Sequence, residues 1–429
     1  MKTEFENIII GFGKAGKTLA AYLAQQGETV ALVEKSKEMY GGTCINIGCI
    51  PTKSLITNAE KNIPYNEAIA IKNNLIEKLR ASNYNALSQL ETVEVIDATA
   101  SFVSEKEIEL TFADGSKKEI LGDKIFINTG TIPFIPNIEG INSKNIFDST
   151  GLINTEILPE KLLIVGAGFI GLEFASMYAK FGSEVTVLDN NADFLAREDS
   201  DVSAEIHHIL TENNIKIIQN ASVQKFENEG ENVVATINIE GENVKMNANA
   251  VLIATGRKPN VEKLNLQNAG VETNERGFVK VNDKLQTNIP NIWALGDVNG
   301  GPQFTYISLD DFRIVKGQLS GNEGYNSLEQ RSQTAFSVFI SPPFSHVGMK
   351  EKDAEKNNID FKVYKLPTAK VPKANILQQT EGFLKAVVNN ANNEILGITL
   401  ICPESHEIIN IATIAVNEKW NFERLRDMI

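Results

Sequence analysis

The sequence predicts an α/β fold made of two dinucleotide-binding domains and a C-terminal α+β domain. Three observations support this prediction. A glycine-rich motif follows an apolar run twice, a second motif at a strand end also occurs twice, and residues 326–429 carry neither motif. A chain of 429 residues is long enough for about three domains.

The first glycine-rich motif lies near the N-terminus. The apolar run 8–10 predicts a strand that leads into three glycines with the spacing G-x-G-x-x-G: Gly11, Gly13 and Gly16. The first glycine permits a tight turn, the second lets the backbone approach a pyrophosphate, and the third allows close packing of helix and strand. After a helical pattern, a second apolar run ends at Glu34, which is placed to accept hydrogen bonds from a ribose.

The second copy repeats this order. Its three glycines follow the apolar run 162–165: Gly166, Gly168 and Gly171. In both copies an acid follows the third glycine by 18 positions, and here it is Asp189. A carboxylate at this point binds a ribose 2′-hydroxyl and repels a 2′-phosphate. Because no arginine follows before Arg197, we expect NADH rather than NADPH to bind this unit.

The second repeated motif and the C-terminal region complete the organisation. Residues 125–133 end a strand with Asn-Thr-Gly-Thr-Ile-Pro, and 251–259 end one with Ala-Thr-Gly-Arg-Lys-Pro. The C-terminal region predicts three strands and one helix with an apolar face: 336–339, 361–366, 383–388 and 406–416. This pattern favours an α+β domain that holds no cofactor and forms an interface.

Two cysteines lie directly after the first dinucleotide-binding unit. Cys44 and Cys49 belong to the run Gly-Gly-Thr-Cys-Ile-Asn-Ile-Gly-Cys-Ile-Pro-Thr-Lys, residues 41–53. Five residues of regular helix rise about 7.5 Å, whereas a disulfide needs Cα atoms within about 7 Å, so the oxidised segment cannot be one regular helix. Pro51 fits the first turn of a helix that begins after Cys49. A helix N-terminus lowers the pKa of a thiol, which favours a Cys49 thiolate.

We interpret this pair as a redox-active disulfide that takes electrons from a flavin. The alternatives are a structural disulfide and a zinc half-site. Zinc would need a second pair of ligands, none is evident, and no metal is predicted. Asp297 follows the apolar run 291–295 and could bind a ribityl hydroxyl or be an ordinary turn carboxylate.

Composition narrows the function classes. A net charge of −14 disfavours nucleic acid and anionic membranes as partners. Three cysteines argue against a secreted disulfide scaffold and for a reducing compartment, the cytoplasm. The N-terminus lacks the pattern of a secretion signal, and Glu173 with three glycines interrupts the apolar segment 162–179, so we expect no membrane span.

Together these motifs resemble the class I pyridine nucleotide-disulfide oxidoreductases, which include lipoamide dehydrogenase, glutathione reductase and mercuric reductase. The motif G-G-T-C-x-N-x-G-C-x-P-x-K, both glycine fingerprints, Ala-Thr-Gly-Arg and Gly-Asp occur in family order along nearly the whole chain. Residues 11–18, 39–53 and 303–311 look closest to the bacterial reactive-chlorine-resistance flavoproteins, also described as hypothiocyanite reductases.

The resemblance implies two Rossmann-like domains, for FAD and NAD, plus a C-terminal α+β dimerisation domain. The implied boundaries are 1–150 with 265–325 for FAD, 151–264 for NAD and 326–429 for dimerisation. The family ends in a His-Pro-x-x-x-Glu acid–base motif that would begin just after Ile429. We therefore expect the last residues of this domain to be missing from the sequence, and we assign no histidine base.

The resemblance also implies roles for individual residues. FAD would contact Gly11, Gly13, Gly16, Glu34, Gly42, Thr43, Gly130, Asp297, Gln303, Phe304, Thr305 and Tyr306. NADH would contact Gly166, Gly168, Phe169, Ile170, Gly171, Asp189 and Gly256. Lys53 and Glu173 would form an ion pair near the flavin, with a surface pair as the alternative. Phe169 would cover the flavin before NADH enters, with plain packing as the alternative. Cys49 would lie nearer the flavin and Cys44 would meet the substrate.

The expected activity is FAD-dependent, NADH-driven reduction of hypothiocyanous acid or hypothiocyanite to thiocyanate by a cytoplasmic homodimer. The substrate, a small-molecule oxidant, follows from the resemblance alone. Dihydrolipoamide dehydrogenase activity and copper(II) reduction remain alternatives. Mercuric reductase and large thioredoxin reductases need a further C-terminal thiol or selenol pair, which is not visible in this sequence. A non-enzymatic oxidant or copper sensor would show stoichiometric oxidation without steady turnover of NADH. A structural subunit of a dehydrogenase complex would co-purify with an acyltransferase core.

Overall fold

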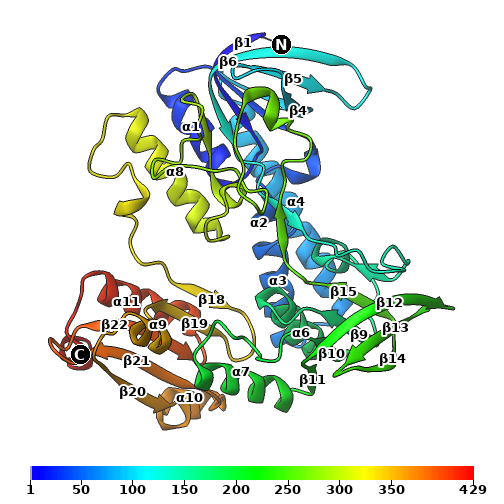
Figure 1. Cartoon of the computed structure of the whole chain (residues 1–429), viewed down its shortest axis with the longest axis vertical. Helices are drawn as coiled ribbons and strands as arrows, with labels where there is room; N and C mark the ends of the chain where they lie inside the picture. The colour runs from blue at the N-terminus through cyan, green and yellow to red at the C-terminus, as the bar shows by residue number, and fades with distance from the viewer. Residues whose placement is uncertain (1) are drawn as a thin grey trace. The chain divides into compact units, whose positions relative to one another are not determined.

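The computed structural model describes residues 2–429, which form two compact units. The first unit contains residues 2–55, Glu67–Phe134 and Gly256–Arg331. The second unit contains Ile56–Asn66, Ile135–Thr255 and Ser332–Ile429. Figure 1 labels the helices and strands of both units.

A seven-stranded sheet forms the centre of the first unit, in the order β3-β2-β1-β6-β5-β4 with β17 paired to β6. Its strands are β1 (Glu4–Ile10), β2 (Val30–Glu34), β3 (Val93–Asp97), β4 (Thr99–Phe102), β5 (Glu107–Thr111), β6 (Lys117–Ile127) and β17 (Ile292–Ala294). β1 is parallel to its neighbours, with Ile8 opposite Ala31 and Ile125. Because β1 is buried on both faces, an unbroken isoleucine run replaces the alternating pattern of a half-exposed strand.

Successive isoleucines of β1 enter two hydrophobic clusters on opposite faces of this sheet. Ile8 and Ile10 belong to one cluster and Ile9 to the other. Helices α1 (Lys14–Gln25) and α8 (Thr305–Leu319) pack together and contribute to the cluster of Ile9. Further elements include α2 (Thr43–Asn46), α3 (Cys49–Glu60), α4 (Tyr65–Ser88), η3 (Gly296–Asn299) and the two-stranded antiparallel sheet of β7 (Thr131–Pro133) with β16 (Arg257–Pro259).

The second unit contains a parallel five-stranded sheet in the order β11-β10-β9-β15-β8. Its strands are β8 (Ile146–Phe147), β9 (Lys161–Val165), β10 (Glu184–Leu188), β11 (Ile215–Ile218) and β15 (Ala250–Ile253). Its helices are α5 (Ser149–Leu152), α6 (Phe169–Phe181) and α7 (Ser200–Glu212). A three-stranded antiparallel sheet, β12 (Ala221–Glu229), β13 (Asn232–Ile239) and β14 (Glu242–Ala248), follows β11 in the chain.

A second five-stranded sheet of this unit is antiparallel, in the order β18-β19-β22-β21-β20. Its strands are β18 (Phe336–Val338), β19 (Phe344–Gly348), β20 (Phe361–Pro367), β21 (Phe383–Asn389) and β22 (Ile395–Ile401). The helices around it are α9 (Glu351–Lys356), α10 (Pro372–Leu377), α11 (Ser405–Asn417) and α12 (Phe422–Arg426). The three strands and the helix predicted for this region are confirmed, whereas β19 and β22 were missed.

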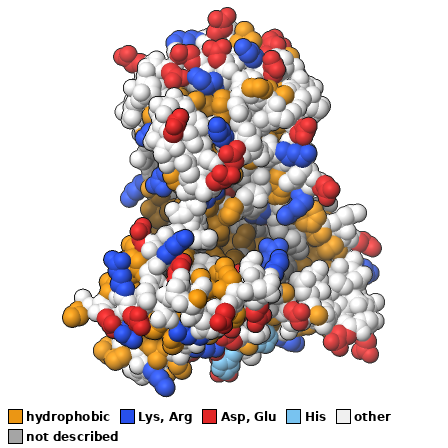
Figure 2. All heavy atoms as spheres, turned by 60° about the vertical axis from the view of Figure 1, so that its left-hand side comes forward, with side chains coloured by type: hydrophobic (Ala, Val, Ile, Leu, Met, Phe, Trp, Pro, Cys, Tyr) orange, Lys and Arg blue, Asp and Glu red, His pale blue; other side chains and the backbone are white. Residues whose placement is uncertain are grey.

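These observations confirm the predicted fold class, with a mixed sheet and a parallel sheet that each contain a strand leading into a glycine fingerprint, and a C-terminal α+β part. The three-domain boundaries stay a prediction, because the compact units divide the chain differently. The apolar segment 162–179 folds into β9 and α6, and no helix among residues 2–429 is both long and apolar enough to cross a membrane. Figure 2 shows acidic and basic side chains interspersed over the face in view.

Candidate functional site

The two glycine fingerprints adopt the same local geometry. β1 and β9 each end at a first glycine, and Gly13 and Gly168 precede the first residues of α1 and α6. A Cβ atom on the third glycine would lie 2.5 Å from the carbonyl oxygen of Gly11 in one copy and 2.1 Å from that of Gly166 in the other. Only glycine therefore fits at Gly16 and Gly171. Both helix N-termini present backbone N–H groups to a phosphate.

Asn128 supports the first fingerprint, although the sequence reasoning gave it no role. Its Oδ1 atom accepts the N–H of Gly16 at 2.9 Å, and its Nδ2 group donates to the carbonyl of Leu295 at 2.7 Å. Ser308 on α8 accepts the N–H of Ala15 at 3.2 Å. The polar Asn128 at the end of the apolar strand β6 was the available signal.

The two predicted ribose-binding acids lie at strand ends. Glu34 ends β2, and its carboxylate accepts the N–H groups of Phe12 at 3.0 Å and Ser36 at 3.3 Å. Burial raises the pKa of Glu34, and these hydrogen bonds oppose that effect. Asp189 follows β10, and its Oδ1 atom accepts the backbone and side-chain N–H groups of Asn191 at 3.1 and 2.8 Å.

Asp297 lies in a polar chain that the sequence did not reveal. The hydroxyl of Thr131 donates to Asp297 Oδ2 at 3.1 Å and accepts the Nε–H of Arg257 at 2.8 Å. Burial raises the pKa of Asp297, while the Arg257 charge and the Thr131 hydrogen bond lower it. These hydrogen bonds join both copies of the Thr-Gly motif to the Gly-Asp motif, because β7 and β16 pair in a two-stranded antiparallel sheet.

The cysteine segment folds as two short helices rather than one. Cys44 lies in α2, Cys49 begins α3, and the intervening residues 47 and 48 break the helix. Asn46 fixes this bend, because its Nδ2 group donates to the carbonyls of Tyr40 and Gly42, both at 2.9 Å. A Cβ atom on Gly42 would lie 2.7 Å from the Cα of Gly13, so the segment packs directly on the first fingerprint.

The two cysteines are free thiols that interact with each other. Cys44 is half-buried, and the Cys49 side chain is exposed. The hydrogen bond between the sulfurs is the largest cause that lowers the pKa of Cys49, to about 6, with further contributions from Thr305 and Lys53. The same hydrogen bond, together with burial, raises the pKa of Cys44. This arrangement favours the thiolate at Cys49, with Cys44 as the hydrogen-bond donor.

Two of the predicted residues at the start of α8, Thr305 and Tyr306, interact with Cys49. The hydroxyl of Thr305 lies 3.5 Å from Cys49 Sγ. Phe304 and Tyr306 stack with ring centroids 5.1 Å apart, and burial followed by the Cys49 charge raises the pKa of Tyr306. Gln303 is half-buried just before this helix. The family resemblance implied that these residues lie near the flavin. The fold adds that Thr305 also lies beside the sulfur of Cys49.

Lys17 is a second residue that sequence reasoning missed. Its Nζ atom donates to the carbonyl of Gly41 at 3.4 Å and to Asn83 Oδ1 at 2.5 Å. Burial lowers the pKa of Lys17 to about 8, and the charge of Lys14 adds to this effect. A negative charge on Cys44 raises the pKa of Lys17, so the protonation states of these two residues are linked.

Lys53 and Glu173 occupy α3 and α6. The Glu173 carboxylate accepts the N–H of Phe339 at 2.9 Å. Because the two residues belong to different compact units, their ion pair stays a prediction. Phe169 begins α6 beside the exposed Ile170, and its ring stacks on that of Phe336 with centroids 5.4 Å apart.

The residues present fit a bound dinucleotide in the first unit. Thr129, just before Gly130, has a buried hydroxyl with no hydrogen-bond partner among residues 2–429, as expected for a group that a ligand completes. Thr43 begins α2, directly after the loop that packs on the first fingerprint. FAD would lie along this loop, with Glu34 and Asp297 as its carboxylate contacts. Gly256, whose carbonyl accepts the N–H of Phe134, belongs to this unit, so its contact with NADH stays a prediction.

Family models match almost the whole chain. The model described as pyridine nucleotide-disulphide oxidoreductase matches residues 5–311, and that of the corresponding dimerisation domain matches residues 334–429.

Relatives with the same architecture cover the chain from end to end. It is 45% identical to the probable pyridine nucleotide-disulfide oxidoreductase RclA of Escherichia coli (strain K12), over 99% of this chain and 96% of the relative. Mercuric reductase of Staphylococcus aureus is 31% identical, over 99% of this chain and 79% of the relative. A solved structure, the Cu(II) complex of HOCl-induced flavoprotein disulfide reductase RclA from Escherichia coli, superposes with a TM-score of 0.96 at 44% identity, over 100% of this chain and 96% of that one.

Proposed function

Because the chain belongs to the pyridine nucleotide-disulphide oxidoreductase family, we propose that it is an FAD-dependent, NADH-driven reductase of hypothiocyanous acid. The observation that carries this proposal is geometric: Cys49 lies at the first turn of α3, beside a second thiol and 3.5 Å from the Thr305 hydroxyl, and these neighbours lower its pKa. Such a pair offers a thiolate at neutral pH and a partner that resolves a mixed disulfide. FAD, when bound, would pass two electrons from NADH to this pair.

In the proposed reaction, the Cys44 thiolate attacks the sulfur of hypothiocyanous acid. An S–S bond forms, the S–O bond breaks, and the departing hydroxide takes a proton to become water. The Cys49 thiolate then attacks the sulfur of Cys44, thiocyanate leaves, and the Cys44–Cys49 disulfide forms. Two electrons pass from the two thiols to the oxidant.

The shared proton decides which sulfur reacts. Cys44 becomes the nucleophile when its proton moves to Cys49, and the lower pKa of Cys49 lets that sulfur lose the proton again for the second step. The assignment of Cys44 to the substrate rests on family resemblance. A small electrophile with a good leaving group needs no large pocket and no histidine base.

An oxidant substrate is supported by the Escherichia coli relative, which is described as HOCl-induced. The experiment is an NADH-oxidation screen of the holoprotein with hypothiocyanous acid, lipoamide, glutathione disulfide and copper(II). Steady turnover with hypothiocyanous acid, and release of one thiocyanate per NADH, are expected. A single stoichiometric oxidation without turnover would instead indicate an oxidant sensor, and turnover with lipoamide alone would indicate a dihydrolipoamide dehydrogenase.

Copper(II) reduction is the second candidate, because the Escherichia coli relative was solved as a Cu(II) complex. The reduced Cys44–Cys49 pair would convert two Cu(II) ions to two Cu(I) ions as the disulfide forms. NADH-dependent Cu(I) production that disappears in Cys44→Ser would support this activity.

We further propose NADH as the preferred reductant, because Asp189 occupies the end of β10 and would repel a 2′-phosphate. The ratio of kcat/KM for NADH and NADPH tests this proposal, and a clear preference for NADPH would contradict it.

A homodimer through the C-terminal part is supported by the dimerisation-domain match and by an exposed apolar stripe on α11. Ile408, Ile411 and Ile414 are 39%, 49% and 53% exposed, and their spacing places them on one helix face.

A further inference from the structure

The segment between β10 and α7 follows the proposed ribose-binding acid, Asp189, and contacts residues much later in the sequence. It starts directly after Asp189 and runs over residues 190–199, which we name the ribose loop. The carboxylate of Asp189 is oriented from within this loop, through its two hydrogen bonds to Asn191. The path of the ribose loop therefore determines how Asp189 is presented to a nucleotide.

Contacts at both ends hold the ribose loop. At its start, the carbonyl of Asn191 accepts the N–H of Asn220 at 3.2 Å. At its end, three consecutive backbone carbonyls accept hydrogen bonds from the side chains of two lysines that follow β19. Lys352 Nζ donates to the carbonyl oxygens of Ala196 at 2.8 Å and Glu198 at 2.7 Å. Lys350 Nζ donates to the carbonyl oxygen of Arg197 at 3.0 Å. Lys350 also pairs with the buried Glu198 carboxylate at 2.9 Å.

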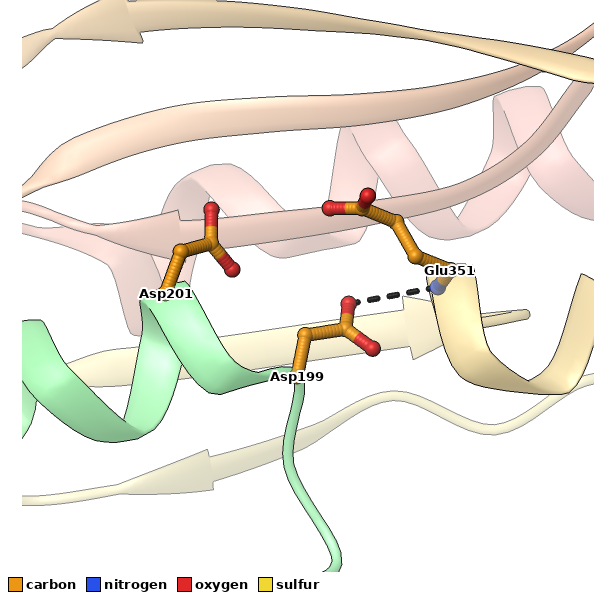
Figure 3. A group of neighbouring side chains, drawn as sticks. All are labelled: Asp199, Asp201 and Glu351. Carbon is orange, nitrogen blue, oxygen red and sulfur yellow. Dashed lines mark hydrogen bonds between the residues drawn. The ribbon is translucent and has the colours of Figure 1, made fainter. Parts of the chain in front are cut away.

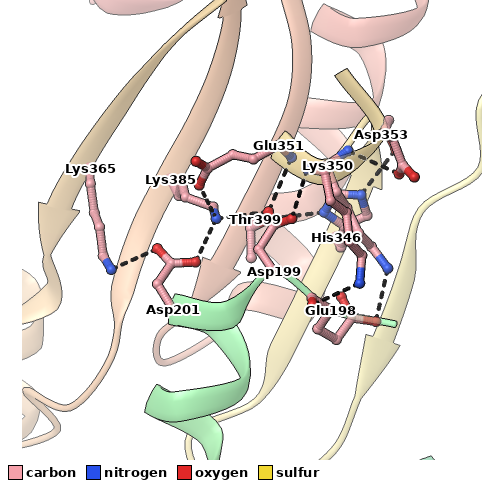
Figure 4. A network of polar contacts seen from close by, with 12 residues as sticks. Glu198, Asp199, Asp201, His346, Lys350, Glu351, Asp353, Lys365, Lys385 and Thr399 are labelled. Atoms are coloured by element: carbon pink, nitrogen blue, oxygen red, sulfur yellow. Dashed lines mark hydrogen bonds and ion pairs between the residues drawn. The ribbon is translucent and has the colours of Figure 1, made fainter. Parts of the chain in front are cut away.

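The ribose loop in turn caps the helix that carries one of these lysines. The Asp199 carboxylate accepts the N–H groups of Glu351 and Lys352 at the start of α9, both at 3.2 Å. Figure 3 shows Asp199, Asp201 and Glu351 pointing toward one another. Among residues 2–429 they form the one group of three carboxylates with metal-ligand spacing. A buried ammonium already satisfies them, because Lys385 Nζ lies 2.9, 2.7 and 2.6 Å from their oxygens (Figure 4).

The middle of the ribose loop needs such restraint. Leu195 has φ of +47°, a left-handed conformation that is strained for a residue with a side chain. Such conformations persist only where surrounding contacts over-determine them. The buried Phe194 precedes it, and the carbonyl of Ala196, held by Lys352, follows it.

We propose that Lys350 and Lys352 are positioning residues for NADH: they fix the ribose loop and thereby the orientation of Asp189. Residues of the C-terminal part, which holds no glycine fingerprint, thus set the affinity of the nucleotide site. This inference rests on the proposed binding of NADH at the second fingerprint. It makes nucleotide affinity dependent on two lysines whose side chains contact, in the ribose loop, backbone carbonyls and the Glu198 carboxylate.

The test compares holoproteins in which both lysines are replaced by methionine, which keeps the apolar stem and removes the charge. Anaerobic rapid mixing with NADH gives the apparent Kd and the limiting rate of flavin reduction without any oxidant substrate. Calorimetric titration with NAD⁺ and amide hydrogen exchange of residues 190–199 give two readouts that do not depend on activity. The double variant Lys350→Arg and Lys352→Arg keeps both positive charges and tests whether charge is enough to maintain nucleotide affinity. Lys365→Met is the matched control, because Lys365 pairs with Asp201 on α7 and does not touch the ribose loop.

We expect the methionine variant to raise the Kd of NADH and NAD⁺ about fivefold or more, the usual lower range of coupling between sites. Exchange of residues 190–199 should quicken, the limiting rate should change little, and the arginine variant and Lys365→Met should behave as wild type. Unchanged nucleotide affinity, whether or not exchange quickens, would overturn the inference. If the double variant fails to fold, Lys352→Met alone carries the same expectation. Failure of the wild-type holoprotein to react with either nucleotide would instead contradict the proposed function.

Discussion

The sulfur of Cys49 lies 3.5 Å from the hydroxyl oxygen of Thr305, although 256 positions separate the two residues. Cys49 begins α3 and Thr305 begins α8, so the N-termini of two helices meet at one sulfur. A helix N-terminus and a hydroxyl donor both favour a negative charge. They add to the hydrogen bond from Cys44, which is the largest cause of the low pKa of Cys49.

Replacement of Thr305 by valine should raise the pKa of Cys49, because it removes a hydrogen-bond donor and keeps the side-chain volume. One hydrogen bond contributes about 1 kcal/mol, which corresponds to a rise of somewhat less than about one pH unit. The pH dependence of alkylation of the reduced protein by iodoacetamide measures this shift. Thr305→Ser keeps the hydroxyl and should behave as wild type, and an unchanged midpoint in Thr305→Val would show that the hydroxyl does not stabilise the thiolate.

The two cysteines should be separable by spectroscopy, because Cys49 is the sulfur of lower pKa. Cys44→Ser should abolish reduction of hypothiocyanous acid but keep the long-wavelength absorbance of a thiolate beside oxidised flavin, since serine at 44 can still donate to Cys49. Cys49→Ser should abolish both. Full turnover in either variant would exclude the Cys44–Cys49 pair as the electron route.

Lys385→Met should destabilise the second unit strongly. The Lys385 side chain is fully buried between Asp199, Asp201 and Glu351. Removing one partner of a buried ionic cluster costs about 3–5 kcal/mol, and the loss here should lie near the lower figure, because Asp199 stays buried whereas Asp201 and Glu351 are partly exposed. Urea-induced unfolding at neutral pH measures this loss.

Two further observations check the explanation for Lys385. Lys365→Met removes a half-exposed pair with Asp201 and should cost no more than about 1 kcal/mol. The lysine lowers the pKa of Asp199 and Asp201 in the folded protein, so wild-type stability from this cluster is present above the unfolded pKa of about 4 and is lost below it. The difference between wild type and Lys385→Met should therefore shrink in acid, and a constant difference would contradict the electrostatic explanation.

His346 should make the fold sensitive to mild acid. This side chain of β19 is 4% exposed, and its Nε2–H donates to the carbonyl of Gly348 at 3.0 Å, so Nδ1 accepts the hydroxyl of Thr399 at 2.9 Å. Burial lowers the pKa of His346 to about 4, and the charge of Lys350 adds to this effect.

Because the unfolded chain takes up a proton at higher pH than the folded one, stability from His346 is complete above about pH 6.5 and falls as the pH drops toward about 4, by about 3 kcal/mol in all. His346→Gln removes this proton uptake, so its free energy of unfolding should decline less between these pH values. Parallel decline of the two proteins would show that His346 does not titrate on unfolding.

Ile411→Glu should weaken the proposed homodimer, because it places a charge in the middle of the apolar stripe on α11. Sedimentation velocity should show monomer at concentrations where wild type is dimeric. Ile157→Glu is the matched control: Ile157 is 83% exposed and lies outside the dimerisation-domain match. A dimeric Ile411→Glu variant would locate the interface elsewhere, and a monomeric wild-type protein would contradict the proposed homodimer.

Most of the nucleotide-binding architecture could be predicted from local sequence, because each of its motifs spans few residues. The glycine spacing dictates a turn and a helix start, the isoleucine run dictates a buried parallel strand, and the acid at the next strand end follows from the repeat. The break in the cysteine segment also follows from local geometry. The strands β19 and β22 were harder, because β19 begins beside Pro343 and β22 contains Gly397, residues that weaken the strand pattern.

The sequence by itself determined the two fingerprints, their acids and the cysteine pair, because short-range sterics and the repeat of 18 positions encode them. The helix start after Cys49 already favoured a thiolate there, and only the tertiary structure added the hydroxyl from α8 and the second sulfur, which lower the pKa of Cys49. It also decided that Lys350 and Lys352 hold the ribose loop, although about 150 positions separate them from it. Hydrogen bonds and charges act through space, and no local pattern records which distant residues the packed strands bring within reach.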